Sequence, residues 1–183
     1  MDKKIRVGVL FGGKSAEHEI SLLSAKNIVD ALDRDKYEII LIGIDKNGEW
    51  HERRSDEYLL HKDDPKKITL IESKDAVALI PKEDGKQFVS LSTSSTTQAI
   101  DVVFPVLHGT HGEDGTVQGL LKLAGIPFVG ASVLGSAIGM DKDVMKRLLR
   151  DAGILVAKFL VFTEEMEISF SEVEKELGLP FFV

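Results

Sequence analysis

The chain has 183 residues, of which 43% are hydrophobic, and its 30 acidic and 23 basic side chains give a formal net charge of −7; this composition excludes a wholly disordered chain and a basic nucleic-acid-binding domain. The absence of cysteine excludes disulfide frameworks, zinc–thiolate sites and thiol nucleophiles. Because no apolar run is long enough to cross a bilayer and residues 1–6 lack the apolar stretch of a signal peptide, we expect a cytoplasmic protein with neither nucleic-acid nor membrane partners.

A βαβ unit is predicted at the beginning of the chain. The apolar run 5–10 ends at a Gly-Gly pair and is typical of a buried strand. Apolar side chains then recur at helical spacing over residues 16–33, with Ser15 as the expected cap of the helix. A second apolar run at 37–44 completes the unit, which implies a parallel sheet.

The following stretch is less regular. A turn at 45–48 leads into residues 49–52, which we expect to pair back on the preceding strand as a hairpin. Residues 53–98 are charged, and short strands are expected within them at 76–80 and 87–91. We interpret this stretch as an elaboration on the edge of the sheet.

Regular structure is predicted again from residue 100. The apolar run 100–107 predicts a third buried strand, and a glycine-rich turn at 108–115 separates it from a helix at 116–124. A short strand at 128–129 and a small-residue segment at 132–139 follow. Together these elements predict an α/β fold with a doubly wound, mainly parallel, Rossmann-like sheet.

The remaining residues begin a different pattern. We expect a helix from about 140 to 152, a strand at 158–162, a helix at 169–177 and the beginning of a strand at 181–183. An unpaired apolar strand leaves its ladder groups unsatisfied. We therefore expect that the sequence is interrupted within a domain.

The first glycine turn is ambiguous as a motif. Residues 8–15 fit the phosphate-loop pattern G-x-x-x-x-G-K-[ST], but bulky Val9, Leu10 and Phe11 suit a buried strand better than a loop. We favour a Gly-Gly turn onto a helix N-terminus, which is a general site for anions and small ligands. There Glu17 either complements the helix dipole or holds a substrate ammonium group.

The second glycine turn carries the most information. Residues 108–119 combine four glycines with His108, His111, Glu113 and Asp114. This composition fits either a simple strand-to-helix connection with charges at the helix start or a turn that faces a ligand. We favour the ligand, because the carboxyl ends of parallel strands meet at one edge of the sheet. The His-x-x-His-x-Glu spacing gives only weak support for a metal site.

A lysine at the start of a later helix is a further candidate. Asp141 is a natural N-cap, and Lys142 in the first turn opposes the helix dipole. A bound anion would offset that unfavourable charge. The alternative is an ordinary solvated lysine.

Four stretches together resemble the D-alanine–D-alanine ligase family. The turn at 11–21 is similar to the family's N-terminal turn, and the HGxxGEDGTVQG sequence at 108–119 matches its signature throughout. Residues 129–142 match the next block, and the Gly-Leu-Pro at 178–180 precedes the family's first lysine-bearing strand of the ATP-grasp fold. The resemblance covers the chain except residues 46–98.

The resemblance implies a domain organisation and a reaction. It implies an N-terminal α/β substrate domain (pre-ATP-grasp) at 1–139 and the incomplete start of an ATP-grasp domain at 140–183. The family joins two D-alanines for peptidoglycan synthesis: the first carboxylate takes the γ-phosphoryl group of ATP to form an acyl phosphate, and the second amine attacks it. D-alanine and ATP are thus the expected partners, with Mg²⁺ or Mn²⁺ as the metal and a homodimer as the assembly.

The resemblance also implies roles for individual residues. Glu17 and His108 match catalytic residues that bind the first D-alanine, Glu113 more weakly matches a substrate-site residue, and Lys142 matches a lysine that reaches the nucleotide phosphates. No magnesium ligand is implied within residues 1–183, so we expect this chain alone to be inactive. The alternatives are a ligase that uses D-lactate or D-serine, a non-catalytic amino-acid- or nucleotide-binding module, and a P-loop nucleotidase.

Overall fold

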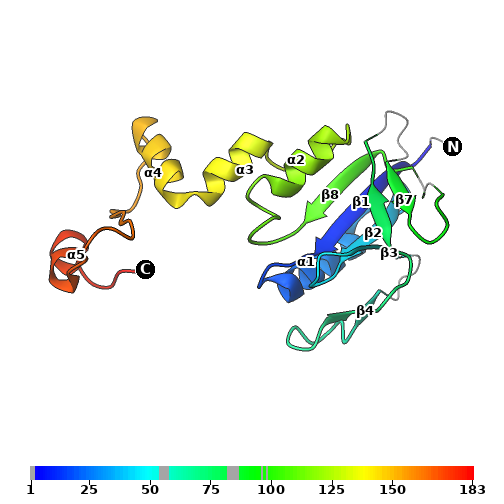
Figure 1. The fold of residues 1–183 in the computed structure, drawn as a ribbon, viewed down its shortest axis with the longest axis horizontal. Coiled ribbons are helices and arrows are strands. Elements are labelled where there is room, and N and C mark those ends of the chain that lie inside the picture. Colours follow the sequence, from blue (N-terminus) through cyan, green and yellow to red (C-terminus); the bar gives the residue numbers. More distant parts are fainter. Residues whose placement is uncertain (1–2, 54–57, 82–86, 96, 98) are drawn as a thin grey trace. The chain divides into compact units, whose positions relative to one another are not determined.

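The computed structural model describes most of the chain in two compact units, Met1–Ala137 and Ile138–Val183. Figure 1 shows the elements in chain order. The residues described are 3–53, 58–81, 87–95, 97 and 99–183. The domain assignment 1–139 and 140–183 stays a prediction.

The first unit is built on a four-stranded sheet. Its strands are β1 (Ile5–Gly12), β2 (Tyr37–Ile44), β3 (Trp50–Arg53) and β8 (Val102–Val106), in the order β3-β2-β1-β8. The central strand β1 runs parallel to both of its neighbours, whereas β3 is antiparallel to β2. The three expected parallel strands and the expected hairpin are therefore confirmed.

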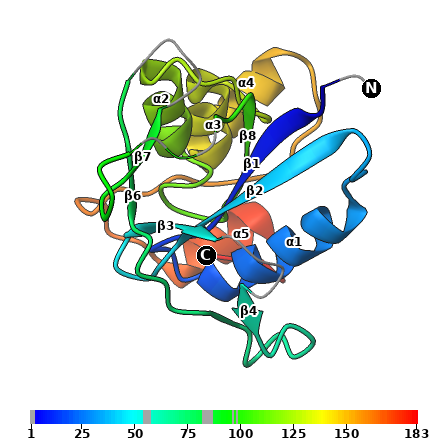
Figure 2. The same cartoon turned by 90° about the vertical axis from the view of Figure 1, so that its right-hand side faces the viewer.

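Helices cover both faces of this sheet (Figure 2). Helix α1 (His18–Ala31) packs its buried side in one core cluster with Phe11 of β1, and α2 (Thr116–Leu123) packs in a second cluster with Leu10. Because successive residues of a strand point to opposite faces, one apolar run supplies both cores. Burying each such side chain contributes about 1.5–3 kcal/mol. The α/β fold class is thus confirmed.

Helix α1 begins later than the sequence predicts. Its first helical residue is His18, and Glu17 occupies the N-cap position without a capping side-chain hydrogen bond. Ser15, the expected cap, instead accepts a hydrogen bond from the Glu17 N–H at 2.9 Å. The prediction of Ser15 as helix cap was therefore wrong, because its hydroxyl stabilises the turn that precedes the helix.

Short strands elaborate the edge of the sheet. The strands predicted at 76–80 and 87–91 are confirmed as an antiparallel pair, and a bridge between His51 and Ala76 joins this pair to β3. A second small pair was not predicted. The four strands are β4 (Leu59–Leu60), β5 (Thr69–Leu70), β6 (Val77–Leu79) and β7 (Phe88–Ser90).

Three helices follow α2 in the described part of the chain. Helix α3 (Val133–Met140) was not predicted from its small residues, whereas α4 (Lys142–Asp151) and α5 (Phe170–Leu177) were. The strands predicted at 158–162 and 181–183 were wrong, because no described residue offers them a hydrogen-bonded partner strand.

The strand predicted at 128–129 is reduced to one bridge between Val103 and Phe128. In the described part of the chain, no helix combines the length and apolarity that a bilayer-crossing segment needs.

Candidate substrate site at the carboxyl edge of the sheet

The first glycine turn is fixed by steric limits. Strand β1 ends at Gly12, which has φ +92°, and a Cβ atom there would overlap the carbonyl oxygen of Ile44. The N–H of Gly13 donates to that same oxygen at 2.9 Å. Only glycine can pass this close to β2, so the turn leaves the sheet at one defined place. Because the bulky residues before Gly12 lie in β1, a phosphate loop at residues 8–15 is ruled out.

Two buried polar side chains of α1 hold this turn. The Ser21 hydroxyl accepts from the N–H of Gly12 at 2.7 Å and donates to the carbonyl oxygen of Val106, so it links β1, α1 and β8. His18 is only 4% exposed, and its Nδ1 lies 2.8 Å from the carbonyl oxygen of Gly13. Since a carbonyl only accepts, Nδ1 carries the proton.

Sequence reasoning assigned no role to Ser21 or His18. A usable signal was present, because Ser21 stands on the same helical stripe as Ala25 and Val29, both of which are buried in the core. A polar side chain inside an apolar stripe must find a hydrogen-bond partner there.

The second glycine turn is held by its own carboxylates. Glu113 accepts from the N–H of Gly109 at 2.8 Å, while Asp114 accepts from the N–H groups of His111 at 2.8 Å and Thr116 at 3.0 Å. Burial acts to raise the pKa of Asp114, but these hydrogen bonds outweigh it and lower that pKa below its ordinary value. The carboxylate therefore stays ionised and fixes the path from β8 into α2.

The two turns meet at Gly109. This residue has φ +71°, and a Cβ atom on it would lie 2.6 Å from Oε2 of Glu17. Next to it, Nε2 of His108 lies 3.0 Å from Oγ of Ser24, and Nδ1 lies 3.8 Å from Oε1 of Glu113. The structure thus brings Glu17, His108 and Glu113 together around one glycine, with both carboxylates exposed and the imidazole half-buried.

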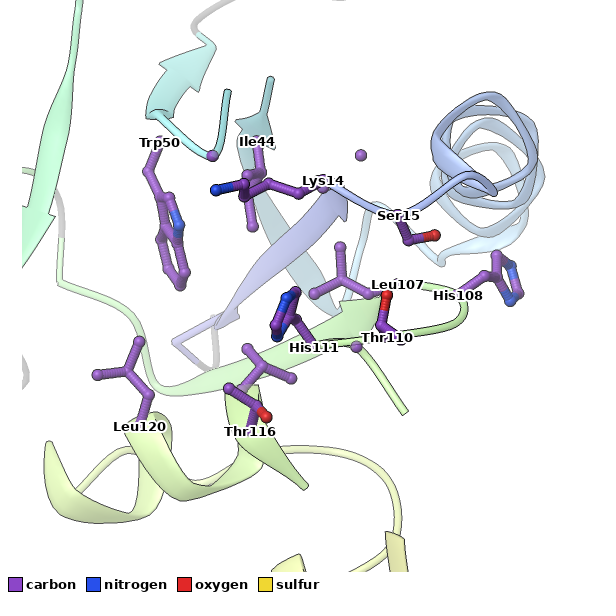
Figure 3. A pocket seen from close by; sticks show the side chains of 15 residues that line it. Lys14, Ser15, Ile44, Trp50, Leu107, His108, Thr110, His111, Thr116 and Leu120 are labelled. Carbon is purple, nitrogen blue, oxygen red and sulfur yellow. The ribbon is translucent and has the colours of Figure 1, made fainter. Parts of the chain in front are cut away.

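A hollow of about 150 Å³ lies beside this group. His111 extends into it toward Trp50, whereas the ring of His108 turns away toward α1 (Figure 3). His108 is one of its lining residues, but Glu17 and Glu113 are not. Its walls are formed by apolar Ile44, Trp50, Leu107, Val117 and Leu120, by polar Lys14, Ser15, His108, Thr110, His111 and Thr116, and by Gly12, Gly13, Gly48 and Gly112.

Lys142 belongs to the second unit, Ile138–Val183. It is exposed and is the first residue of α4, after Asp141, whose Oδ1 accepts from the N–H of Val144 at 3.0 Å. The predicted N-cap is thereby confirmed. Within the described residues, Lys142 has no ion pair with a carboxylate.

These features define a class of protein: an α/β domain with a candidate small-molecule site at the carboxyl edge of its parallel strands, where carboxylates and an imidazole meet. A family model described as D-ala D-ala ligase N-terminus matches residues 6–131. The chain belongs to the D-alanine–D-alanine ligase family.

Individual relatives agree with this assignment. The chain is 52% identical over 182 residues to the D-alanine–D-alanine ligase of Oceanobacillus iheyensis. The aligned region covers 98% of this chain and 50% of that protein. It is likewise 52% identical over 183 residues to D-alanine–D-alanine ligase A of Escherichia coli (strain K12), and this alignment covers 99% of this chain and 50% of that protein. The chain therefore spans about half the length of the curated relatives it matches.

Solved structures show the same likeness. The D-alanine–D-alanine ligase from Coxiella burnetii is 35% identical with a TM-score of 0.77, covering 95% of this chain and 49% of that one. The D-alanine–D-alanine ligase from Bacillus anthracis complexed with ATP is 30% identical with a TM-score of 0.58, and the match covers 95% of this chain and 43% of that one.

Proposed function

We propose that this chain carries the first-substrate half of a D-alanine–D-alanine ligase, which joins two D-alanines at the expense of ATP for peptidoglycan synthesis in the cytoplasm. The observation that carries the proposal is the meeting of Glu17, His108 and Glu113 around Gly109. The 52% identity to two D-alanine–D-alanine ligases supports it and favours D-alanine over D-lactate or D-serine.

Glu17 would hold the ammonium group of the first D-alanine. An ammonium ion needs a charged partner to offset the loss of its hydration, and a carboxylate supplies a charge-assisted hydrogen bond. Glu17 precedes α1 and is exposed, so its carboxylate is open to a ligand. Its backbone is held by the bond from its N–H to Ser15 and by the bond from the Ser21 N–H to its carbonyl.

His108 would lie beside the reacting carboxylate of that D-alanine. Ser24 and Glu113 flank its two ring nitrogens and limit the orientation of the imidazole. The substrate carboxylate takes the γ-phosphoryl group of ATP and becomes an acyl phosphate. The amine of the second D-alanine then attacks the carbonyl, and phosphate leaves. Of the two ring nitrogens, Nδ1 would donate a hydrogen bond to the oxygens on which charge develops, because Nε2 is already bonded to Ser24 at 3.0 Å whereas Nδ1 lies 3.8 Å from Glu113.

Glu113 would act as a positioning residue. It accepts the N–H of Gly109 at 2.8 Å and thereby fixes the backbone next to His108. Its second oxygen lies 3.8 Å from Nδ1 of His108, on the side of the ring opposite Ser24.

Lys142 would contact the phosphates of ATP. Its place in the first turn of α4 puts a lysine charge at a helix N-terminus, a combination that suits a polyphosphate. ATP supplies the phosphoryl group, and Mg²⁺ or Mn²⁺ would spread its negative charge. We also propose a homodimer, as the family likeness implies.

The test joins this chain to the C-terminal half of the Escherichia coli ligase A and measures ADP and phosphate release with D-alanine. We expect the folded chimera to turn over and the chain alone to be inactive. Glu17→Gln in the chimera should lower kcat/KM by about 10- to 100-fold, as expected for one charged hydrogen bond of about 1.5–3 kcal/mol.

The matched control is Glu38→Gln, which removes an exposed carboxylate near the start of β2. It should leave turnover unchanged. A chimera whose turnover is equally insensitive to both substitutions would contradict the assignment of Glu17.

A further inference from the structure

We propose that the hairpin between β2 and β3 holds a site for one Zn²⁺ ion, formed by Asp45, Glu49 and His51. Nε2 of His51 lies 3.8 Å from Oε2 of Glu49 and 4.0 Å from Oδ2 of Asp45. One ligand atom from each residue lies within 4.8 Å of the other two. None of the three lines the hollow at the substrate site, because β3 alternates and its Trp50 faces that hollow instead.

The hairpin turn prepares Asp45 to act as a ligand. Its Oδ1 accepts from the N–H groups of Asn47 at 2.8 Å and Glu49 at 2.9 Å, so Oδ2 is left facing His51. One carboxylate oxygen is thus held in place by the turn.

His51 supplies the observation that points to a ligand. It is 8% exposed, and its Nδ1 has no hydrogen-bond partner among the residues that the structure describes. Its Nε2 faces the two carboxylates at distances longer than a hydrogen bond. A buried imidazole nitrogen without a partner costs free energy. A cation between Nε2 and the carboxylates would give Nε2 a partner through its lone pair, with the ring proton on Nδ1.

The donor set selects the type of metal. One imidazole nitrogen and two carboxylate oxygens suit Zn²⁺, whereas Mg²⁺ and Ca²⁺ favour oxygen ligands alone. Zn²⁺ binds these atoms at about 2.0–2.2 Å, so the triangle must contract slightly. Glu49 can move inward because its side chain is 71% exposed. Water would complete the tetrahedron.

Neighbouring cations reduce the attraction only in part. Arg53 lies on the same face of β3 as His51, and its positive charge interacts with Asp45. This charge would repel a bound metal ion. Lys46 is paired with Glu19 at 2.5 Å, so its charge is already partnered. Two carboxylates against one guanidinium leave the cluster with a negative charge.

The experiment titrates the untagged 183-residue chain with Zn²⁺ in a calorimeter, and with Co²⁺ as a spectroscopic probe of coordination. We expect one Zn²⁺ per chain with micromolar affinity. His51→Gln should weaken binding at least tenfold, and Glu49→Gln and Asp45→Asn should weaken it several-fold. Glu49→Gln changes an exposed side chain and decides the question if His51→Gln does not fold.

The matched control is His61→Asn, which removes an exposed histidine outside the cluster and keeps a residue type that tolerates the positive φ of 50° found there. It should bind Zn²⁺ like the unchanged chain. Absence of one-to-one binding would overturn the proposal. So would binding that persists in both His51→Gln and Glu49→Gln, or that is lost in His108→Asn instead.

Discussion

Ser21 is the residue whose loss should damage the candidate site most through the fold alone. It is fully buried, and its hydroxyl bridges the N–H of Gly12 and the carbonyl of Val106. Ser21→Ala leaves both buried groups without this partner, at a cost of about 1–3 kcal/mol for each unsatisfied group. The higher helix propensity of alanine offsets roughly half a kcal/mol of this loss in the free energy of unfolding. We therefore expect the free energy of unfolding to fall by about 1.5–5.5 kcal/mol.

Urea unfolding followed by tryptophan fluorescence measures this loss. Trp50 is the only tryptophan, lies in β3 and stacks on Phe88, so its signal reports the first unit. Ser24→Ala is the matched control, one turn further along α1, because among the described residues its hydroxyl hydrogen-bonds only to the half-buried ring of His108. It should cost less than about 1 kcal/mol. Equal losses in the two variants, or a loss below about half a kcal/mol in Ser21→Ala, would refute the bridging role of Ser21.

Three further predictions follow from individual contacts. Gly109→Ala forces a Cβ atom against Glu17 at φ +71°. It should destabilise the first unit by about 1–2 kcal/mol. An unchanged free energy of unfolding in urea would contradict the conformation described for this turn. Asp101, whose pKa Arg6 lowers to about 2 through its side-chain hydrogen bonds, stabilises the fold above pH 4 and loses this contribution as the pH falls toward 2. Asp101→Asn should therefore lower the free energy of unfolding by about 1 kcal/mol at pH 7, after discounting for solvent exposure. If the difference in unfolding free energy between this variant and the unchanged chain stayed constant down to pH 2, the ionised carboxylate would be excluded as its cause. Asp141→Ala removes the cap of α4 and should lower helicity measured by circular dichroism, at a cost of about 1 kcal/mol, whereas Asp141→Asn should largely preserve it.

The sequence was sufficient for the sheet because its strands are continuous apolar runs. Strands β1, β2 and β8 are buried on both faces, so hydrophobicity alone marks them. The runs at 158–162 and 181–183 have a similar composition but lack a partner strand among the described residues. Hydrophobicity shows that a segment can be a strand, while pairing decides whether it is one.

The candidate site was predictable in its residues but not in its contacts. Glycine turns after apolar runs locate the sheet edge, and the family resemblance assigns Glu17 and His108 to it. The hydrogen bond between Ser24 and His108 spans 84 positions, and no local pattern encodes such a pairing. Helix α3 was missed because glycine, serine and alanine carry little periodic signal.

The central claim is that the two glycine turns form one site for D-alanine. A titration of the ¹⁵N-labelled chain with D-alanine, followed by amide NMR, tests it most directly. We expect D-alanine to shift the signals of residues 12–18 and 107–113 more strongly than L-alanine does, and Glu17→Gln to abolish these shifts. Identical shifts with both enantiomers, or shifts confined to other parts of the chain, would contradict it.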